Sequence, residues 1–341
     1  MPPRRSSLRA WLRSAAALTV VLWLPAARAA EDPEAIARGR YVFHATACDS
    51  CHTDHPEHGA FLAGGRRMDT EFGTFYVPNI TPDVETGIGA WSAEDFRRAM
   101  IEGEAPDGSH YYPVFPYRWY TGMTEEDLAA LWAYLQSVPA VRNRARPHEL
   151  PFPLDQRLLL LSWKLINFDQ GERVSDPDRS AAWNRGAYLV NHLGHCGACH
   201  TPKLFGAVFL GWKHLAGSAK IPGPYPAPNI TPDRATGLGH WSGADMVRAL
   251  QRAIMPTGEP IRGPMAEYVA SGSSHLSAAD LAAMATYLRS IEPDEGPVSE
   301  REERLDRRLL AGDAADDAAA DGRAAGMDLL RLSTVERSPA Q

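Results

Sequence analysis

The four cysteines of the chain are the residues whose type and spacing most directly predict chemistry. All four lie in two blocks of the pattern C-x-x-C-H, which are Cys48-Asp-Ser-Cys51-His52 and Cys196-Gly-Ala-Cys199-His200. This pattern attaches haem covalently, because two intervening residues within a helical turn place both thiols along one edge of the porphyrin. The adjacent histidine then faces the iron as its proximal ligand. The sequence therefore predicts two covalently bound haem c groups, each with its iron ligated by the histidine of its motif.

Two other kinds of site use the same residue types. Cysteine and histidine are also zinc ligands, and a C-x-x-C pair can form a disulfide. Two complete motifs in similar surroundings, behind a predicted export signal, favour haem, with zinc as the main alternative.

Outside the two motifs, the chain contains a long internal repeat. The hexapeptide P-N-I-T-P-D that starts at Pro78 occurs again 150 residues later at Pro228. A flanking T-G-[IL]-G-x-W-S segment and an upstream R-G-x-Y segment also occur twice. The period is too long for a solenoid, so it indicates a tandem duplication of a whole domain.

Helix start signals place the motifs in a helical framework. Hydroxyl residues that can act as N-caps are each followed three residues later by aspartate, and they are Ser92, Thr124, Ser242 and Ser277. Alternating strand patterns are scarce, and loops rich in proline and glycine separate the helical segments. We therefore expect an all-α fold of two domains, in which helices and long loops surround a covalently bound haem. Such a domain buries little apolar surface by itself, so the haem should fill much of its core.

The composition divides the chain into five segments. Residues 1–29 combine basic residues, an apolar run and a small-x-small cleavage pattern, as a signal peptide does. The apolar run is too short to span a bilayer. We therefore expect cleavage after Ala29, export to the periplasm and no transmembrane helix afterwards. The other segments are domain 1 (33–138), a linker (139–178), domain 2 (179–291) and a charged tail (292–341) that we expect to be disordered.

The predicted mature chain is acidic. The whole sequence has a formal net charge of −7, and removal of residues 1–29 takes away five arginines and no acidic residue, which leaves −12. A polyanion of this kind repels nucleic acid and favours basic protein partners. We therefore expect no nucleic-acid partner.

The motifs together resemble a known family. C-x-x-C-H, P-N-I-T-P-D, T-G-[IL]-G-x-W-S and the closing D-L-A-A-x-x-x-Y-L helix are similar to the multihaem cytochrome c subunits of membrane-associated alcohol, aldehyde and gluconate dehydrogenases, and to their smaller dihaem relatives. The resemblance covers residues 33–291 and implies two class I-like cytochrome c domains. Subunits of that family commonly carry three haems, whereas this chain has two attachment motifs.

The resemblance also implies a sixth ligand for each iron. Met265, in the segment Gly263-Pro-Met265, stands where similar proteins place their axial methionine. In the first repeat Phe115 stands where some relatives have methionine, and Met123 is the expected substitute. A methionine sulfur closes the coordination sphere and raises the reduction potential. The alternative ligands are Met255 for the second haem, and Met100 and His110 for the first.

Two classes of function are compatible with these residues. The resemblance implies a periplasmic dihaem carrier, and not an enzyme, that moves single electrons from a periplasmic or membrane-associated dehydrogenase to a cytochrome or terminal oxidase. Such a partner would also associate the chain with the inner membrane. The alternative is a dihaem enzyme of the peroxidase or thiosulfate dehydrogenase type, with one open haem site. Phe115 makes the first haem the candidate for an open site, but no cysteine is left over to act as a distal ligand.

Overall fold

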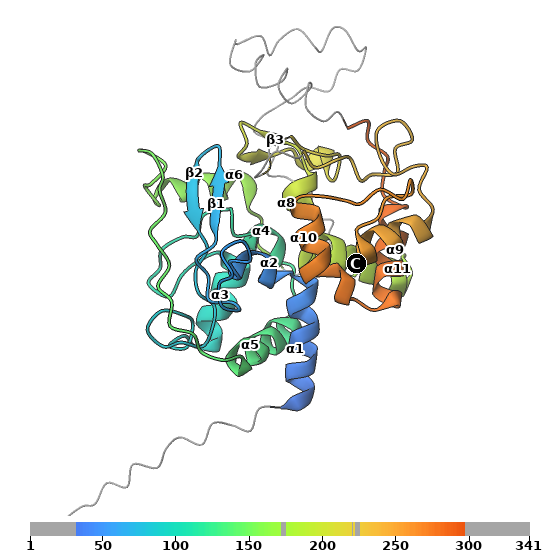
Figure 1. Ribbon diagram of the computed structural model, residues 1–341. Helices are drawn as coiled ribbons and strands as arrows, with labels where there is room; N and C mark the ends of the chain where they lie inside the picture. The colour runs from blue at the N-terminus through green and yellow to red at the C-terminus, as the bar shows by residue number, and fades with distance from the viewer. Residues whose placement is uncertain (1–31, 172–174, 220, 222–225, 297–341) are drawn as a thin grey trace, which may run out of the picture.

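The structure is a computed structural model that describes residues 32–171, 175–219, 221 and 226–296 (Figure 1). The predicted signal peptide, residues 1–29, lies outside these residues, as does the predicted tail from residue 297 onward. The described residues form mainly helices, which confirms the all-α fold class. The strands described are two short antiparallel hairpins, β1 (Arg67–Thr70) with β2 (Gly73–Tyr76) and β3 (Lys203–Leu204) with β4 (Val208–Phe209).

The helices form two similar sets that lie side by side in Figure 1, one for each repeat. The first set comprises α1 (Pro33–Ala45), α2 (Cys48–His52), α3 (Ala93–Glu102), α4 (Tyr117–Tyr120) and α5 (Glu125–Ser137). The second set comprises α7 (Ala181–Tyr188), the π-helical turn η1 (Leu189–Leu193), α8 (Gly197–His200), the 3-10 turn η2 (Gly211–Lys213), α9 (Gly243–Arg252), α10 (Pro264–Ser271), the 3-10 turn η3 (Ser273–His275) and α11 (Ala278–Leu288). The predicted tandem duplication is therefore visible in the order of the elements.

A close helix crossing occurs in both sets. Helix α1 packs on α5, and a Cβ atom at Gly39 would lie only 1.9 Å from the carbonyl oxygen of Ala130. Helix α7 packs on α11 in the same way, and a Cβ atom at Gly186 would lie 1.9 Å from the carbonyl oxygen of Ala283. Any side chain at these positions would push the helices apart. The repeated R-G-x-Y segment therefore sets the spacing between the first and last helices of each domain.

The predicted helix starts are confirmed. Ser92 and Ser242 each form a capping box with the aspartate three residues further on, at the start of α3 and α9. Thr124 and Ser277 each accept a hydrogen bond from the backbone N–H three residues further on, at the start of α5 and α11. A cap of this kind is worth about 1 kcal/mol, so local sequence fixes where these four helices begin.

One apolar core runs through both domains. It contains Val42 and Leu131 from the first domain and Leu189 and Leu281 from the second, and each of them is at most 2 % exposed. The two domains therefore pack directly on each other as well as being joined by the linker.

The predicted linker contains α6 (Leu159–Asn167), which contacts both domains. Trp163 Nε1 donates to the carbonyl of Ala207 at 2.8 Å, and Lys164 Nζ donates to the carbonyl of Glu102 at 2.7 Å. Every helix in the described part of the chain is too short or too polar to cross a bilayer. The exact domain boundaries stay a prediction.

Candidate haem-binding sites

Each C-x-x-C-H motif forms a short helical turn directly after a long helix. The first motif is α2 itself, and in the second Cys196 is the N-cap of α8. The residue before each motif has a left-handed backbone, with φ of 49° at Ala47 and 39° at His195. This conformation is unfavourable for residues with a Cβ atom. Both repeats have this left-handed conformation at the equivalent position, so both have the same sharp turn, which orients the motif that follows.

The motif histidines are prepared to bind iron. His52 Nδ1–H donates to the carbonyl of Pro78 at 2.9 Å, and His200 Nδ1–H donates to the carbonyl of Pro228 at 2.7 Å. This hydrogen bond keeps the proton on Nδ1 and leaves the lone pair of Nε2 for a metal. Burial lowers the pKa of both imidazoles, so the neutral form that ligates iron is favoured.

The P-N-I-T-P-D loops hold the two proline carbonyls in place. Asn79 Oδ1 accepts from the backbone N–H of Thr81, and its Nδ2 donates to the carbonyl of Val141 at 2.7 Å. Asn229 repeats this arrangement and donates to the carbonyl of Asp294 at 2.7 Å. Both asparagines therefore stabilise their loops, and each loop orients the proximal histidine of its own domain.

The four cysteines are free thiols in a desolvated environment. Burial raises the pKa of Cys48 and of Cys196 to about 12 and also raises the pKa of Cys51 and Cys199. The buried thiols are therefore protonated and neutral near pH 7. Within the described residues, no three His, Cys, Asp or Glu side chains converge as a metal cluster. Two thiols and one neutral imidazole per motif fit the donor set of haem c.

The predicted sixth ligands lie on different elements. Met123 is in the turn before α5 and is 2 % exposed, with its backbone N–H bonded to the carbonyl of Tyr120. Met265 is the second residue of α10, packs against the core and is partly exposed. Ligation by either methionine stays a prediction.

The alternative ligands have other contacts. Met100 lies inside α3 and is 5 % exposed in the core. His110 Nδ1 accepts a hydrogen bond from Lys164 Nζ at 2.9 Å. Met255 lies in the loop after α9, with its backbone N–H bonded to the carbonyl of Glu259. Met100 therefore packs in the core, and His110 is hydrogen-bonded to the linker helix α6.

Three aromatic residues beside the motifs were not predicted from the sequence. Trp119 and Tyr120 on α4, and Tyr268 on α10, lie beside the cysteines. The nearby His44 and His192 donate to backbone carbonyls of the opposite domain. The duplication itself is the one sequence signal that could have pointed to an interface of this kind.

Comparisons with known proteins agree with this architecture. The family model described as cytochrome c matches residues 36–139 and 184–292. A "Diheme cytochrome c-type" protein of Cereibacter sphaeroides is 38% identical over 270 residues, which cover 76% of this chain and 89% of that protein.

Two further relatives belong to dehydrogenases. One of the subunits of nicotinate dehydrogenase from Pseudomonas putida is 44% identical over 256 residues, or 75% of this chain and 21% of the relative. The cytochrome c subunit of the quinone alcohol dehydrogenase of Gluconobacter oxydans is 36% identical over 293 residues, or 82% of this chain and 60% of the relative. The chain thus spans about a fifth of the first relative and three fifths of the second. The matched family and the paired motifs lead to one conclusion, that the chain belongs to the cytochrome c family and binds haem c.

Proposed function

We propose that the chain is a dihaem cytochrome c that carries single electrons in the periplasm from a dehydrogenase to a downstream cytochrome or terminal oxidase. The observation that carries this proposal is the repeated proximal geometry, in which a proline carbonyl holds Nδ1–H of His52 and of His200. Haem iron supplies the one-electron chemistry at both sites.

The protein residues bind the cofactor and close its coordination sphere. Cys48 and Cys51 in the first domain, and their counterparts in the second, would form the thioether bonds. Met123 and Met265 would supply the sulfur ligands. Ligation by both a histidine and a methionine would leave no position for a substrate, which favours electron transfer over catalysis.

The relatives support a dehydrogenase as the electron donor. The relatives from Pseudomonas putida and Gluconobacter oxydans, and the "Fructose dehydrogenase cytochrome subunit" of Gluconobacter japonicus at 38% identity, carry the names of dehydrogenase subunits. A predicted net charge of −12 for the mature chain would steer it toward a basic docking surface.

Magnetic circular dichroism of the purified, haem-loaded chain in both redox states tests this proposal. We expect two low-spin haems with methionine–histidine ligation in the ferric state. A high-spin, five-coordinate haem at neutral pH would contradict the carrier and support the alternative enzyme with an open first haem. The Met100→Leu variant is the matched control, because it changes a buried methionine that we assign to packing.

A further inference from the structure

The two domains complete each other through reciprocal hydrogen bonds. Tyr41 Oη of domain 1 donates to Asp280 of domain 2 at 2.5 Å, and Tyr188 Oη of domain 2 donates to Asp127 of domain 1 at 2.7 Å. Tyr41 and Tyr188 are the tyrosines of the two R-G-x-Y segments. The domains therefore face each other through equivalent surfaces, as in an isologous dimer.

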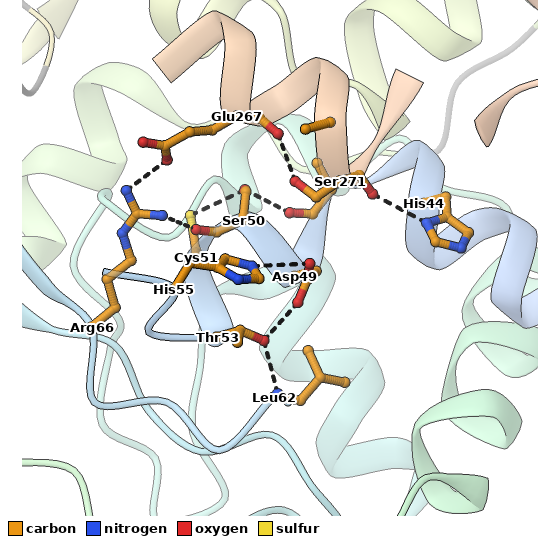
Figure 2. Close-up of polar contacts among 12 residues, drawn as sticks. His44, Asp49, Ser50, Cys51, Thr53, His55, Leu62, Arg66, Glu267 and Ser271 are labelled. Carbon is orange, nitrogen blue, oxygen red and sulfur yellow. Dashed lines mark hydrogen bonds and ion pairs between the residues drawn. The ribbon is translucent and has the colours of Figure 1, made fainter. Parts of the chain in front are cut away.

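Domain 2 covers the first haem motif. The Arg66 guanidinium donates to the carbonyl of Ser50, between the two cysteines of the motif. The same guanidinium forms an ion pair with Glu267 of α10 at 2.6 Å. Figure 2 shows Glu267, Arg66, Ser50 and Cys51 in this arrangement. Helix α10 of domain 2 also contacts α2 directly.

Domain 1 covers the second haem motif in the equivalent way. The indole of Trp119 on α4 lies over Gly197, which stands between the two cysteines, and a Cβ atom at Gly197 would lie 2.3 Å from the ring. His192 Nδ1–H donates to the carbonyl of Trp119 at 2.9 Å and fixes this approach. In both domains the cysteine edge of the motif therefore faces the domain interface.

A row of rings fills the space between the two cysteine edges. The ring of Tyr120 lies 5.5 Å from that of His195, which lies 6.3 Å from the ring of Tyr268. Tyr120 adjoins the first motif, because its hydroxyl donates to the carbonyl of Thr46 at 3.3 Å, and the Thr46 hydroxyl lies 3.1 Å from Cys48 Sγ. At the other end, His195 directly precedes Cys196, and a Cβ atom at Gly194 would lie 2.7 Å from Tyr268 Oη and 3.5 Å from Cys196 Sγ. Tyr120 and His195 also both hydrogen-bond to the backbone of Thr46.

The row carries no charge near neutral pH; Tyr120 is buried, and His195 and Tyr268 are partly exposed. Burial raises the pKa of Tyr120 and Tyr268 well above the usual value, and it lowers the pKa of His195 to about 4. All three rings are therefore neutral near pH 7. Among the described residues, Tyr268 Oη is buried without a hydrogen-bond partner.

We infer that electrons pass between the two haem sites through the domain interface, along the rings of Tyr120, His195 and Tyr268 that join the two cysteine edges. The inference rests on the proposed function, because it requires a haem at each motif. One electron leaves the reduced site and one electron enters the oxidised site. No bond forms or breaks and no proton moves, since the rings stay neutral. The three rings are positioning residues, which supply a closely packed medium between the sites.

The rate of internal electron transfer tests this route. Pulse reduction of the oxidised, haem-loaded full chain by less than one electron per molecule is followed by a relaxation whose rate is independent of protein concentration. We expect Tyr120→Leu and Tyr268→Leu to slow this relaxation about tenfold, because each leaves a gap in the row. Tyr120→Phe keeps the ring and should keep the rate. Tyr134→Leu is the matched control, because Tyr134 also lies near Cys48 but packs on Phe43, outside the row.

The optical spectra and reduction potentials of the leucine variants show whether a slower relaxation comes from the lost ring or from misfolding. In Tyr120→Leu and Tyr268→Leu we expect two low-spin haems with reduction potentials close to those of the wild type. Rates in both leucine variants equal to that of Tyr134→Leu would overturn the route.

A measurement on the wild-type chain does not depend on whether the variants fold. Electron paramagnetic resonance of the fully oxidised protein should show magnetic coupling between the two ferric irons, and this coupling should disappear when one iron is reduced. Uncoupled signals from two intact low-spin haems would contradict the inference that the two cysteine edges face each other. They would not contradict the proposed function. Fewer than two haems per chain would instead contradict the proposed function itself.

Discussion

The two domains share their proximal side almost residue for residue but differ on the distal side. In both, a left-handed residue precedes the motif, and a proline carbonyl holds the proximal histidine. The predicted sulfur ligands differ, because Met123 is buried in the turn before α5, whereas Met265 is partly exposed on α10.

This difference shows which parts of the site depend on local contacts. The proximal side is fixed by short-range bonds within the motif and the P-N-I-T-P-D loop, so a duplicated sequence reproduces it. The predicted distal ligands have no such repeated framework, since Phe115 occupies the expected position in the first repeat and Met123 lies eight residues further on.

The largest expected effect comes from removing the attachment cysteines of one motif while the other motif is kept. The double variant Cys48→Ser/Cys51→Ser should lower the pyridine haemochrome stoichiometry from two haems per chain to one. The double variant Cys196→Ser/Cys199→Ser should give the same value, because the two proximal sides are equivalent. Unchanged stoichiometry in either double variant would contradict the assignment of that motif.

Replacing each predicted methionine ligand with an apolar residue of similar volume compares the distal sides of the two domains. Met123→Leu and Met265→Leu should each convert one low-spin haem to high spin and lower the reduction potential of that site. Apart from the lost iron–sulfur bond, packing alone should cost less than about 1.5 kcal/mol of unfolding free energy, because the substitution conserves volume. Redox titration followed by optical spectroscopy measures the spin state and the reduction potential of each haem. If Met123→Leu keeps two low-spin haems, the first iron has another ligand.

The residue before each motif provides a comparison that depends on pH. Burial lowers the pKa of His195 to about 4, whereas the equivalent residue of domain 1 is Ala47. The unfolded chain binds this proton near pH 6.5 and the folded chain only near pH 4. The free energy of unfolding should therefore decrease as the pH falls through this range, by up to about 3 kcal/mol.

Urea unfolding at neutral pH and near pH 5 measures this dependence. His195→Ala, which installs the residue of domain 1, should lower stability at neutral pH through the cavity it creates but should weaken the pH dependence. An identical pH dependence in His195→Ala would show that His195 is not its source.

The glycine crossings test whether the two domains are packed equally closely. Gly39→Ala and Gly186→Ala should each lower the free energy of unfolding by about 2–3 kcal/mol, since each new Cβ atom overlaps a carbonyl. Gly211→Ala is the control, because nothing lies within 4 Å of its Cβ position. Thermal unfolding of the haem-loaded proteins gives the comparison. Equal stability of Gly186→Ala and Gly211→Ala would refute the close crossing in domain 2.

The smallest effect concerns the reciprocal interface bonds. Tyr188→Phe should lower the free energy of unfolding by about 1–2 kcal/mol, because it removes a bond to the buried Asp127 carboxylate. Both aspartates also pair with an arginine, Asp127 with Arg38 and Asp280 with Arg185. Tyr41→Phe should cost less, since Tyr41 is more exposed than Tyr188. A larger loss for Tyr41→Phe in urea unfolding would contradict this ranking.

The sequence predicts the parts of this molecule that depend on local chemistry. The haem motifs, the helix starts at Ser92 and Ser242 and the duplication all follow from residues close together in the chain. The interface could not be predicted, because Tyr120, His195 and Tyr268 meet only after both domains fold. The short hairpins were also missed, since strands of two to four residues carry too little alternation to detect.

The intact mass of the purified chain under denaturing conditions tests the central claim most directly. Thioether bonds survive denaturation, so the account predicts a chain that carries the mass of two haems after expression with a cytochrome maturation system. A chain with no added haem, or one that binds zinc at the same cysteines, would contradict it.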